Sequence, residues 1–164
     1  MPVSPADDDV QPFDLLGSLP TGATTTVLEA SAGTGKTYTL AGLVARYVAE
    51  GVASLDEMLL ITFGRAATEE LRARVRDQLV EVGEALDDVV LGAAGTRRTD
   101  RGEPDALVRH LCNGDPAEVA RRRDRVRDAL AGFDAATIAT THGFCQVVLR
   151  SLGVAGDSET GLTL

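Results

Sequence analysis

The chain has 164 residues, a hydrophobic fraction of 44% and a formal net charge of −9, which predict one soluble domain with its own core and argue against a surface that is basic all over. Its two cysteines, Cys112 and Cys145, lie far apart without the spacing of metal ligands, so we expect reduced thiols. No apolar run approaches membrane-spanning length and no basic start precedes an apolar stretch, so we expect a cytoplasmic protein.

The N-terminal third contains a glycine-rich loop between two expected elements. Residues 1–12 are acidic and contain proline, so we expect a disordered leader there. Thr25–Leu28 is β-branched and apolar, which predicts a buried strand. A glycine-bearing turn follows, and Lys36 and Thr37 then open an amphipathic helix. Strand, glycine-rich loop and helix, with Gly-Lys-Thr at the junction, are typical of the phosphate-binding P-loop.

The chemistry of a nucleoside triphosphate explains these residue types. Gly33 and Gly35 lack a Cβ, so their N–H groups can approach phosphate oxygens. The positive end of the helix dipole points at the same place. Lys36, the only lysine in the chain, would reach the β- and γ-phosphates, and the Thr37 hydroxyl would hold Mg²⁺; both are our candidate catalytic residues. The candidate residues for binding ATP are Ala30, Ser31, Ala32, Gly33, Thr34, Gly35, Lys36 and Thr37, with Ala30 at the usual position of the motif's first glycine.

The next segment predicts a strand–helix unit. The preceding helix has an apolar face and ends at Glu50-Gly51; the face comprises Leu40, Leu43, Val44, Tyr47 and Val48. Met58–Thr62 predicts a second buried strand, and Thr62-Phe63 follows at its carboxyl end. A long helix comes next, with a buried stripe at Leu71, Val75, Leu79, Val82 and Leu86. Phe63 could stack on a nucleic-acid base or fill the core.

The second half predicts an exposed region and one more strand–helix unit. Residues 87–116 show weak periodicity and read as an exposed loop containing a short helix at Ala106–Cys112. Pro116–Ala131 predicts a salt-bridged surface helix, because its arginines alternate with acids. Ala136–Thr140 predicts a third strand, and Thr141, His142, Gly143 and Phe144 follow it. Hydroxyl, imidazole and aromatic groups thus come directly after a strand, as at Thr62 and Phe63.

The loops after the three expected strands carry chemistry suited to ligands, because open α/β sheets bind ligands at the carboxyl ends of their strands. Taken together, Glu-Ala-Ser-Ala-Gly-Thr-Gly-Lys-Thr, Leu-Leu-Ile-Thr-Phe and Thr-Thr-His-Gly-Phe-Cys-Gln resemble the start of a RecB-type β subunit of exonuclease V, within the UvrD/Rep-like superfamily 1 DNA helicases. The resemblance covers roughly residues 13–155.

This resemblance implies an α/β fold, the RecA-like P-loop NTPase fold, with a parallel sheet between helical layers. It implies that residues 13–155 form the N-terminal part of an incomplete first helicase lobe, followed by a truncated tail at 156–164. It further implies binding of ATP and Mg²⁺ by residues 30–37. The candidate residues for binding single-stranded DNA are Thr62, Phe63, Thr141, His142, Gly143 and Phe144. The family's proteins work at DNA ends in double-strand break repair, with RecC-like and RecD-like subunits.

The chain departs from the family in one motif that hydrolysis needs. An apolar strand ending in Asp-Glu should hold Mg²⁺ and activate water, yet Asp56-Glu57 precedes a strand instead of ending one. We therefore expect an N-terminal piece of a longer helicase that does not unwind DNA alone. Two alternatives stay open: a non-enzymatic module that binds nucleotide or DNA, and a small P-loop kinase-like NTPase.

Overall fold

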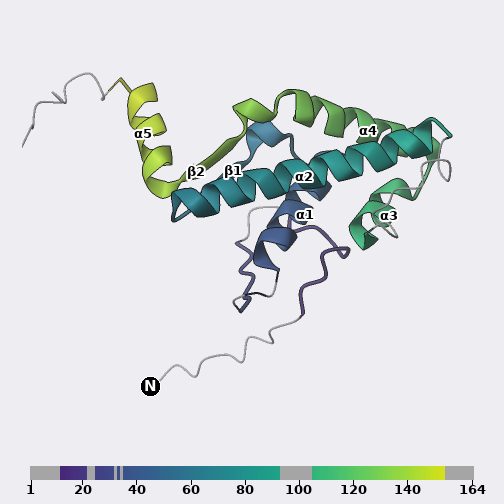
Figure 1. The fold of residues 1–164 in the computed structure, drawn as a ribbon, viewed down its shortest axis with the longest axis horizontal. Helices are drawn as coiled ribbons and strands as arrows, with labels where there is room; N and C mark the ends of the chain where they lie inside the picture. Colours follow the sequence, from purple (N-terminus) through teal and green to yellow (C-terminus); the bar gives the residue numbers. More distant parts are fainter. Residues whose placement is uncertain (1–11, 22–24, 32, 34, 93–104, 154–164) are drawn as a thin grey trace, which may run out of the picture.

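One long helix organises the fold. The computed structural model describes residues 12–21, 25–31, 33, 35–92 and 105–153. Helix α2 (Arg65–Val90) runs along the whole body of the protein, with α1 (Lys36–Ala49), α3 (Ala106–Cys112) and α4 (Pro116–Ala131) packed against it (Figure 1). The strands β1 (Leu59–Thr62) and β2 (Thr137–Thr140) and helix α5 (Thr141–Ser151) lie at the end where α2 begins (Figure 1). Short 3₁₀ turns at Leu55–Glu57 and Phe133–Ala135 precede the strands.

The stripe predicted on α2 is the centre of the core. All five residues of that stripe are at most 4% exposed, and α4 brings Val119 and Val126 against them. The apolar face predicted for α1 is only partly right, because Leu40 is 45% exposed. Leu43, Val44 and Val48 are buried as predicted, and three alanines of α1 lie in the interior beside them: Ala41, Ala45 and Ala49. Their small side chains allow α1 to approach α2 and α4 closely.

The sheet is parallel and has two strands within the described residues. β1 pairs with β2 in the register Leu59↔Thr137 to Thr62↔Thr140. This confirms the α/β class and the positions of the second and third expected strands. The prediction that the first of these is buried was wrong, since Leu59 and Ile61 are 46% and 45% exposed. Helix α2 covers one face of this sheet, and the described chain leaves those two side chains open on the other.

The strand predicted at Thr25–Leu28 is not formed. The segment is irregular and exposed, and Val27 is 76% exposed. A strand of four residues is held by ladder hydrogen bonds to a neighbour. In the described chain the two strands pair with each other alone, so this apolar segment has no ladder to join.

The region expected to be a loop at residues 87–116 is more ordered than that expectation. Helix α2 continues to Val90, α3 occupies Ala106–Cys112 as expected, and α4 begins at Pro116. The expectations for residues 1–11, for 93–104 and for the tail at 156–164 lie outside the described residues. No helix that the structure describes combines the length and apolarity that a membrane crossing requires.

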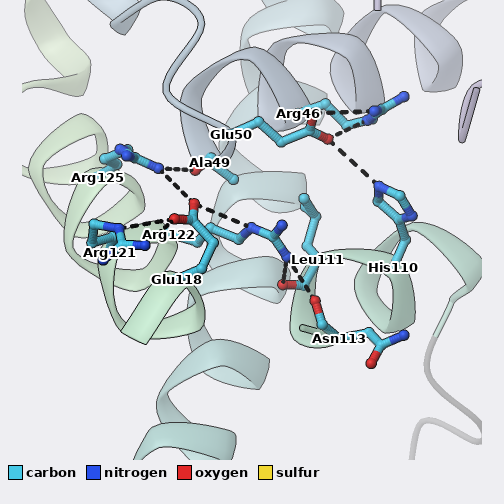
Figure 2. A network of polar contacts seen from close by, with 10 residues as sticks. All are labelled: Arg46, Ala49, Glu50, His110, Leu111, Asn113, Glu118, Arg121, Arg122 and Arg125. Atoms are coloured by element: carbon cyan, nitrogen blue, oxygen red, sulfur yellow. Dashed lines mark hydrogen bonds and ion pairs between the residues drawn. The ribbon is translucent and has the colours of Figure 1, made fainter. Parts of the chain in front are cut away.

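A polar network joins α1, α3 and α4 (Figure 2). Arg46 is 4% exposed; it binds Glu50 through two nitrogens at 2.6 and 3.1 Å and donates to the carbonyl oxygens of Leu15 and Gly17. These bonds fix the segment that precedes the glycine-rich loop against α1. His110 of α3 lies 3.6 Å from Glu50.

Glu118 is the second centre of this network (Figure 2). It accepts from Arg121 at 2.8 Å and from Arg125 at 3.2 Å, while Arg125 also donates to the Ala49 carbonyl of α1. Arg122 donates to the carbonyl oxygens of Leu111, in the last turn of α3, and of Asn113, the residue that follows the helix. The expectation of a salt-bridged helix is therefore confirmed, and two of its arginines also tie α4 to its neighbours.

This arrangement predicts a dependence of stability on pH. The hydrogen bonds from Arg121 and Arg125 hold the pKa of Glu118 below its ordinary value of 4.5. Glu118 therefore adds stability in full above pH 4.5, and this contribution disappears as the pH falls through the lowered pKa. We expect Glu118→Gln to flatten the acid side of the stability curve, measured as urea midpoints between pH 7 and about pH 3. The same substitution at exposed Glu84 of α2 controls for the loss of one negative charge. An equally steep acid limb in both variants would contradict this role.

Candidate functional site

The glycine-rich loop has the backbone shape that the P-loop interpretation requires. Gly33 and Gly35 have φ of +77° and +88°, a region that residues with a Cβ rarely adopt. Ala30 has no positive φ, so alanine is tolerated where the motif usually has glycine. Ala32 and Thr34 lie outside the described residues. The described part of the loop is thus compatible with the binding of phosphate.

Lys36 lies on this loop. Its Nζ donates to the carbonyl oxygens of Ala30 at 2.5 Å and Ser31 at 3.0 Å, and the side chain is exposed. Gly35 caps α1 without a side-chain hydrogen bond, so the first N–H groups of the helix are available to an anion. An ammonium group, the first amides of a helix and positive-φ glycines thus occur together in one short segment, which fits the phosphates of a nucleotide.

The Thr37 hydroxyl is the predicted protein ligand of Mg²⁺. Thr37 is half-buried at the start of α1, where its hydroxyl fits a Mg²⁺ ion that also binds the phosphates. The described residues contain no cluster of three or more His, Cys, Asp or Glu side chains suited to a metal. The nucleotide itself would have to supply most of the ligands.

A tyrosine near this loop links it to the rest of the fold. The Tyr38 hydroxyl donates to the Asp105 carboxylate at the start of α3. Burial, and then this hydrogen bond, raise the pKa of Tyr38 to about 12. The first turn of α1 is therefore anchored to α3 by a neutral phenol, which leaves the cation of Lys36 as the charged group of that turn.

The two strand-end loops lie next to each other. Because Thr62 pairs with Thr140, the residues after β1 and after β2 leave the same edge of the sheet. The Phe63 ring is fully exposed, at 101%, so it does not fill the core. His142 is exposed, and its Nε2 lies 3.0 Å from Nε2 of Gln146 one turn along α5. Gly143 and Phe144 are half-buried, and Thr141 is exposed.

Only two of the three loops share this edge. The glycine-rich loop was expected there because a strand at Thr25–Leu28 would lead into it, and that strand is not formed. The structure thus brings together Thr62, Phe63 and the four residues after β2, whereas no strand of the described chain leads into the phosphate loop at the start of α1. In the described chain no third strand pairs with the outer side of β1 or of β2.

Two residues in the first turn of α2, next to these strand ends, were not singled out from the sequence. Arg65 is exposed as the first residue of α2, directly after Phe63 and Gly64, where a cation could meet a phosphate. Thr68 contacts Thr62 across the β1–α2 junction. A basic residue so soon after an aromatic one could have indicated Arg65; nothing in the sequence singles out Thr68.

The turn after β2 is fixed by a cap, which predicts a measurable local stability. The Thr140 hydroxyl accepts from the Gly143 N–H at 3.0 Å, and no residue of α5 is buried. We expect Thr140→Val to lower helix stability by about 1 kcal/mol and to speed hydrogen exchange at the amides of α5. Thr137→Val in the same strand is the matched control. Exchange in α5 that matches the control would show that the cap does not hold the helix.

Comparisons with known proteins bear on this geometry. A family model described as the UvrD/REP helicase N-terminal domain matches residues 18–162. The chain is 65% identical over 152 residues to the RecBCD enzyme subunit RecB of Mycolicibacterium smegmatis, covering 93% of the chain and 13% of that protein. It is 60% identical over 152 residues to the subunit of the same name from Mycobacterium tuberculosis, with the same coverage. For the Escherichia coli subunit the identity is 35% over 133 residues, 76% of the chain and 10% of that protein.

These matches extend over most of the chain and a small part of the relatives. The chain spans 13% of the length of the mycobacterial relatives it matches. The resemblance drawn from the three motifs is confirmed by a family model that covers nearly all of the described residues. The chain therefore belongs to the UvrD/REP helicase N-terminal domain family.

Proposed function

We propose that the chain is the ATP- and single-stranded-DNA-binding N-terminal portion of a DNA helicase/exonuclease subunit that acts in double-strand break repair and recombination. The observation that carries the DNA contact is Phe63, a fully exposed ring on the edge where Thr62 and Thr140 pair. An aromatic face open to solvent beside a backbone-binding cation is the usual device for holding a single strand. Arg65, the first residue of α2 and two positions after Phe63, supplies that cation.

In this proposal the nucleotide binds at the start of α1. Lys36 and the uncapped N–H groups hold the phosphates, and Thr37 contributes its hydroxyl to Mg²⁺. Residues 30–37 position the triphosphate, which supplies the free energy for movement along DNA in the parent protein. The relatives' name, RecBCD enzyme subunit RecB, supports a parent that assembles with RecC-like and RecD-like subunits. Action at DNA ends in the cytoplasm is part of the same proposal.

The chain on its own is proposed to bind without hydrolysing. In the part of the chain that the structure describes, β1 ends at Thr62 and β2 at Thr140, and neither strand places a carboxylate at the edge where hydrolysis would need one. The same observation favours a second candidate function, a binding module whose affinity for DNA does not depend on ATP. Rapid ATP hydrolysis by the purified chain, lost in Lys36→Ala, would overturn both readings.

The DNA contact can be tested by binding of fluorescent oligothymidine, measured by anisotropy at fixed low salt. We expect Phe63→Ala to weaken binding by about 5- to 150-fold, because stacking is worth about 1–3 kcal/mol per base. Phe13→Ala is the matched control, since Phe13 is also exposed, at 39%, but lies in the N-terminal segment. Equal affinities in the two variants would refute the contact.

A further inference from the structure

The junction between β1 and α2 is held by threonine hydroxyl groups. Only Phe63 and Gly64 separate the strand from the helix. Oγ1 of Thr62 lies 2.5 Å from Oγ1 of Thr68. Both oxygens also lie within hydrogen-bond distance of the Gly64 carbonyl oxygen, at 3.2 and 3.0 Å respectively. The last residue of the strand, the connection and the first turn of the helix therefore meet at one point.

The count of protons shows how this cluster works. Two hydroxyl groups have two protons for three contacts. One hydroxyl therefore donates to the other, and that second hydroxyl donates to the Gly64 carbonyl oxygen. The Gly64 oxygen also accepts from the Thr68 N–H at 3.0 Å. Loss of the Thr68 hydroxyl removes the direct contact between strand and helix, and the Thr62 hydroxyl is then left with the Gly64 carbonyl oxygen, at 3.2 Å.

The Thr68 hydroxyl does more than an ordinary helical threonine. A threonine often donates to the carbonyl four residues earlier in its own helix, and that bond alone would leave the strand free. The contact with Thr62 is different, because it crosses from the helix to the sheet. Gly64 is the N-cap residue of α2 but has no side chain that could bond the free amides, and its backbone is extended, with φ −131° and ψ 154°. The space where its Cβ would stand contains no atom within 4 Å, so core packing does not fix the connection.

We propose that Thr68 is a positioning residue that holds the Phe63–Gly64 connection in the shape that leaves the Phe63 ring open to a DNA base. The proposal rests on the proposed function of Phe63. We call the contact between the Thr62 and Thr68 hydroxyl groups the clamp. Without the clamp, the ends of the connection stay in place, but its backbone gains freedom at Gly64, because glycine has the widest choice of backbone angles. A strand of DNA must then order the connection before a base can stack, which lowers affinity without removing any contact.

The chain offers a clean reporter for this test. It contains no tryptophan, so a Phe63→Trp variant has a single indole at the site. The dissociation constant for oligothymidine follows from quenching of this indole, and its time-resolved anisotropy reports how freely the side chain and its backbone move. The parent for comparison is Phe63→Trp alone. Thr68→Val and Thr68→Ser are each added to it, with Thr137→Val in β2 as the control for losing a threonine hydroxyl.

We expect Thr68→Val to weaken binding by about 2- to 10-fold and to lower the indole anisotropy in the absence of DNA. Thr68→Ser keeps the hydroxyl and should restore both values. In a Phe63→Ala background, where only anisotropy of labelled DNA is measured, Thr68→Val should cause no further loss, because the two residues act through one contact.

Three results would overturn the inference. The first is unchanged affinity in Thr68→Val, and the second is an equal loss in the Phe63→Ala background, which would mean that Thr68 acts through something other than Phe63. The third is a loss in Thr68→Val that Thr68→Ser does not restore. If Phe63→Ala itself leaves affinity unchanged, the proposed function fails and takes this inference with it. That case is recognised because the anisotropy of the indole still falls in Thr68→Val while its quenching by DNA does not change.

Discussion

Replacing Lys36 by alanine is expected to weaken the binding of a fluorescent ATP analogue, in the presence of Mg²⁺, by about 10- to 150-fold. A hydrogen bond that involves a charged group contributes about 1.5–3 kcal/mol, and each 1.4 kcal/mol is a factor of ten in affinity. Lys36 is the only lysine of the chain, and its ammonium already lies on the carbonyl oxygens of the loop. The side chain is exposed, so the substitution should leave the fold intact, as circular dichroism can verify.

The dependence on phosphate number separates a direct contact from a general effect. If Lys36 reaches the β- and γ-phosphates, the loss should be largest for ATP, smaller for ADP and nearly absent for AMP. Arg150→Ala in α5 removes the same charge from an exposed position far along the chain and should leave all three affinities near those of the parent. An equal loss for AMP and ATP would mean that the lysine only shapes the loop, and no loss at all would remove the P-loop interpretation.

Helices were predictable where the sequence encodes them locally. The spacing from Leu71 to Leu86 fixes the buried face of α2 by periodicity alone. Pro116 marks the first turn of α4, as expected for a proline at that position. The ends of β1 and β2 were also located to within a residue or two, because each short apolar and β-branched run ends in a threonine there.

Pairing and covering were not predictable, because they depend on what lies opposite in space. Thr25–Leu28 has the composition of a strand, yet it remains irregular without a ladder to join. The same holds for α5, whose apolar residues Val147 and Leu149 are 56% and 47% exposed. At the candidate site the sequence left open whether the Phe63 ring stacks on a base or fills the core, and only the structure shows that the ring is exposed. The clamp of Thr68 on Thr62 depends on the angle between strand and helix, which no local pattern specifies.

The helix that organises the fold predicts the largest change in stability. Leu79 lies midway along α2 and is fully buried, at 0% exposure, within the core that α1, α3 and α4 share. Leu79→Ala removes buried methyl groups and leaves a cavity, because the surrounding helices can relax only in part. We expect the free energy of unfolding to fall by about 2–5 kcal/mol, measured by urea denaturation with the slope held common to both proteins.

The matched control is the same substitution at Leu149 of α5, which is 47% exposed. Its loss should stay near 0.5 kcal/mol, as is usual for a surface position. α2 begins directly after the Phe63–Gly64 connection. A lower stability of the core should therefore weaken DNA binding only at temperatures where α2 unfolds. Leu79→Ala is therefore expected to keep the parent's affinity for oligothymidine at temperatures well below its lowered midpoint. Equal losses of stability at Leu79 and Leu149 would mean that the core does not centre on α2, and the clamp at its first turn would then have no rigid helix to hold.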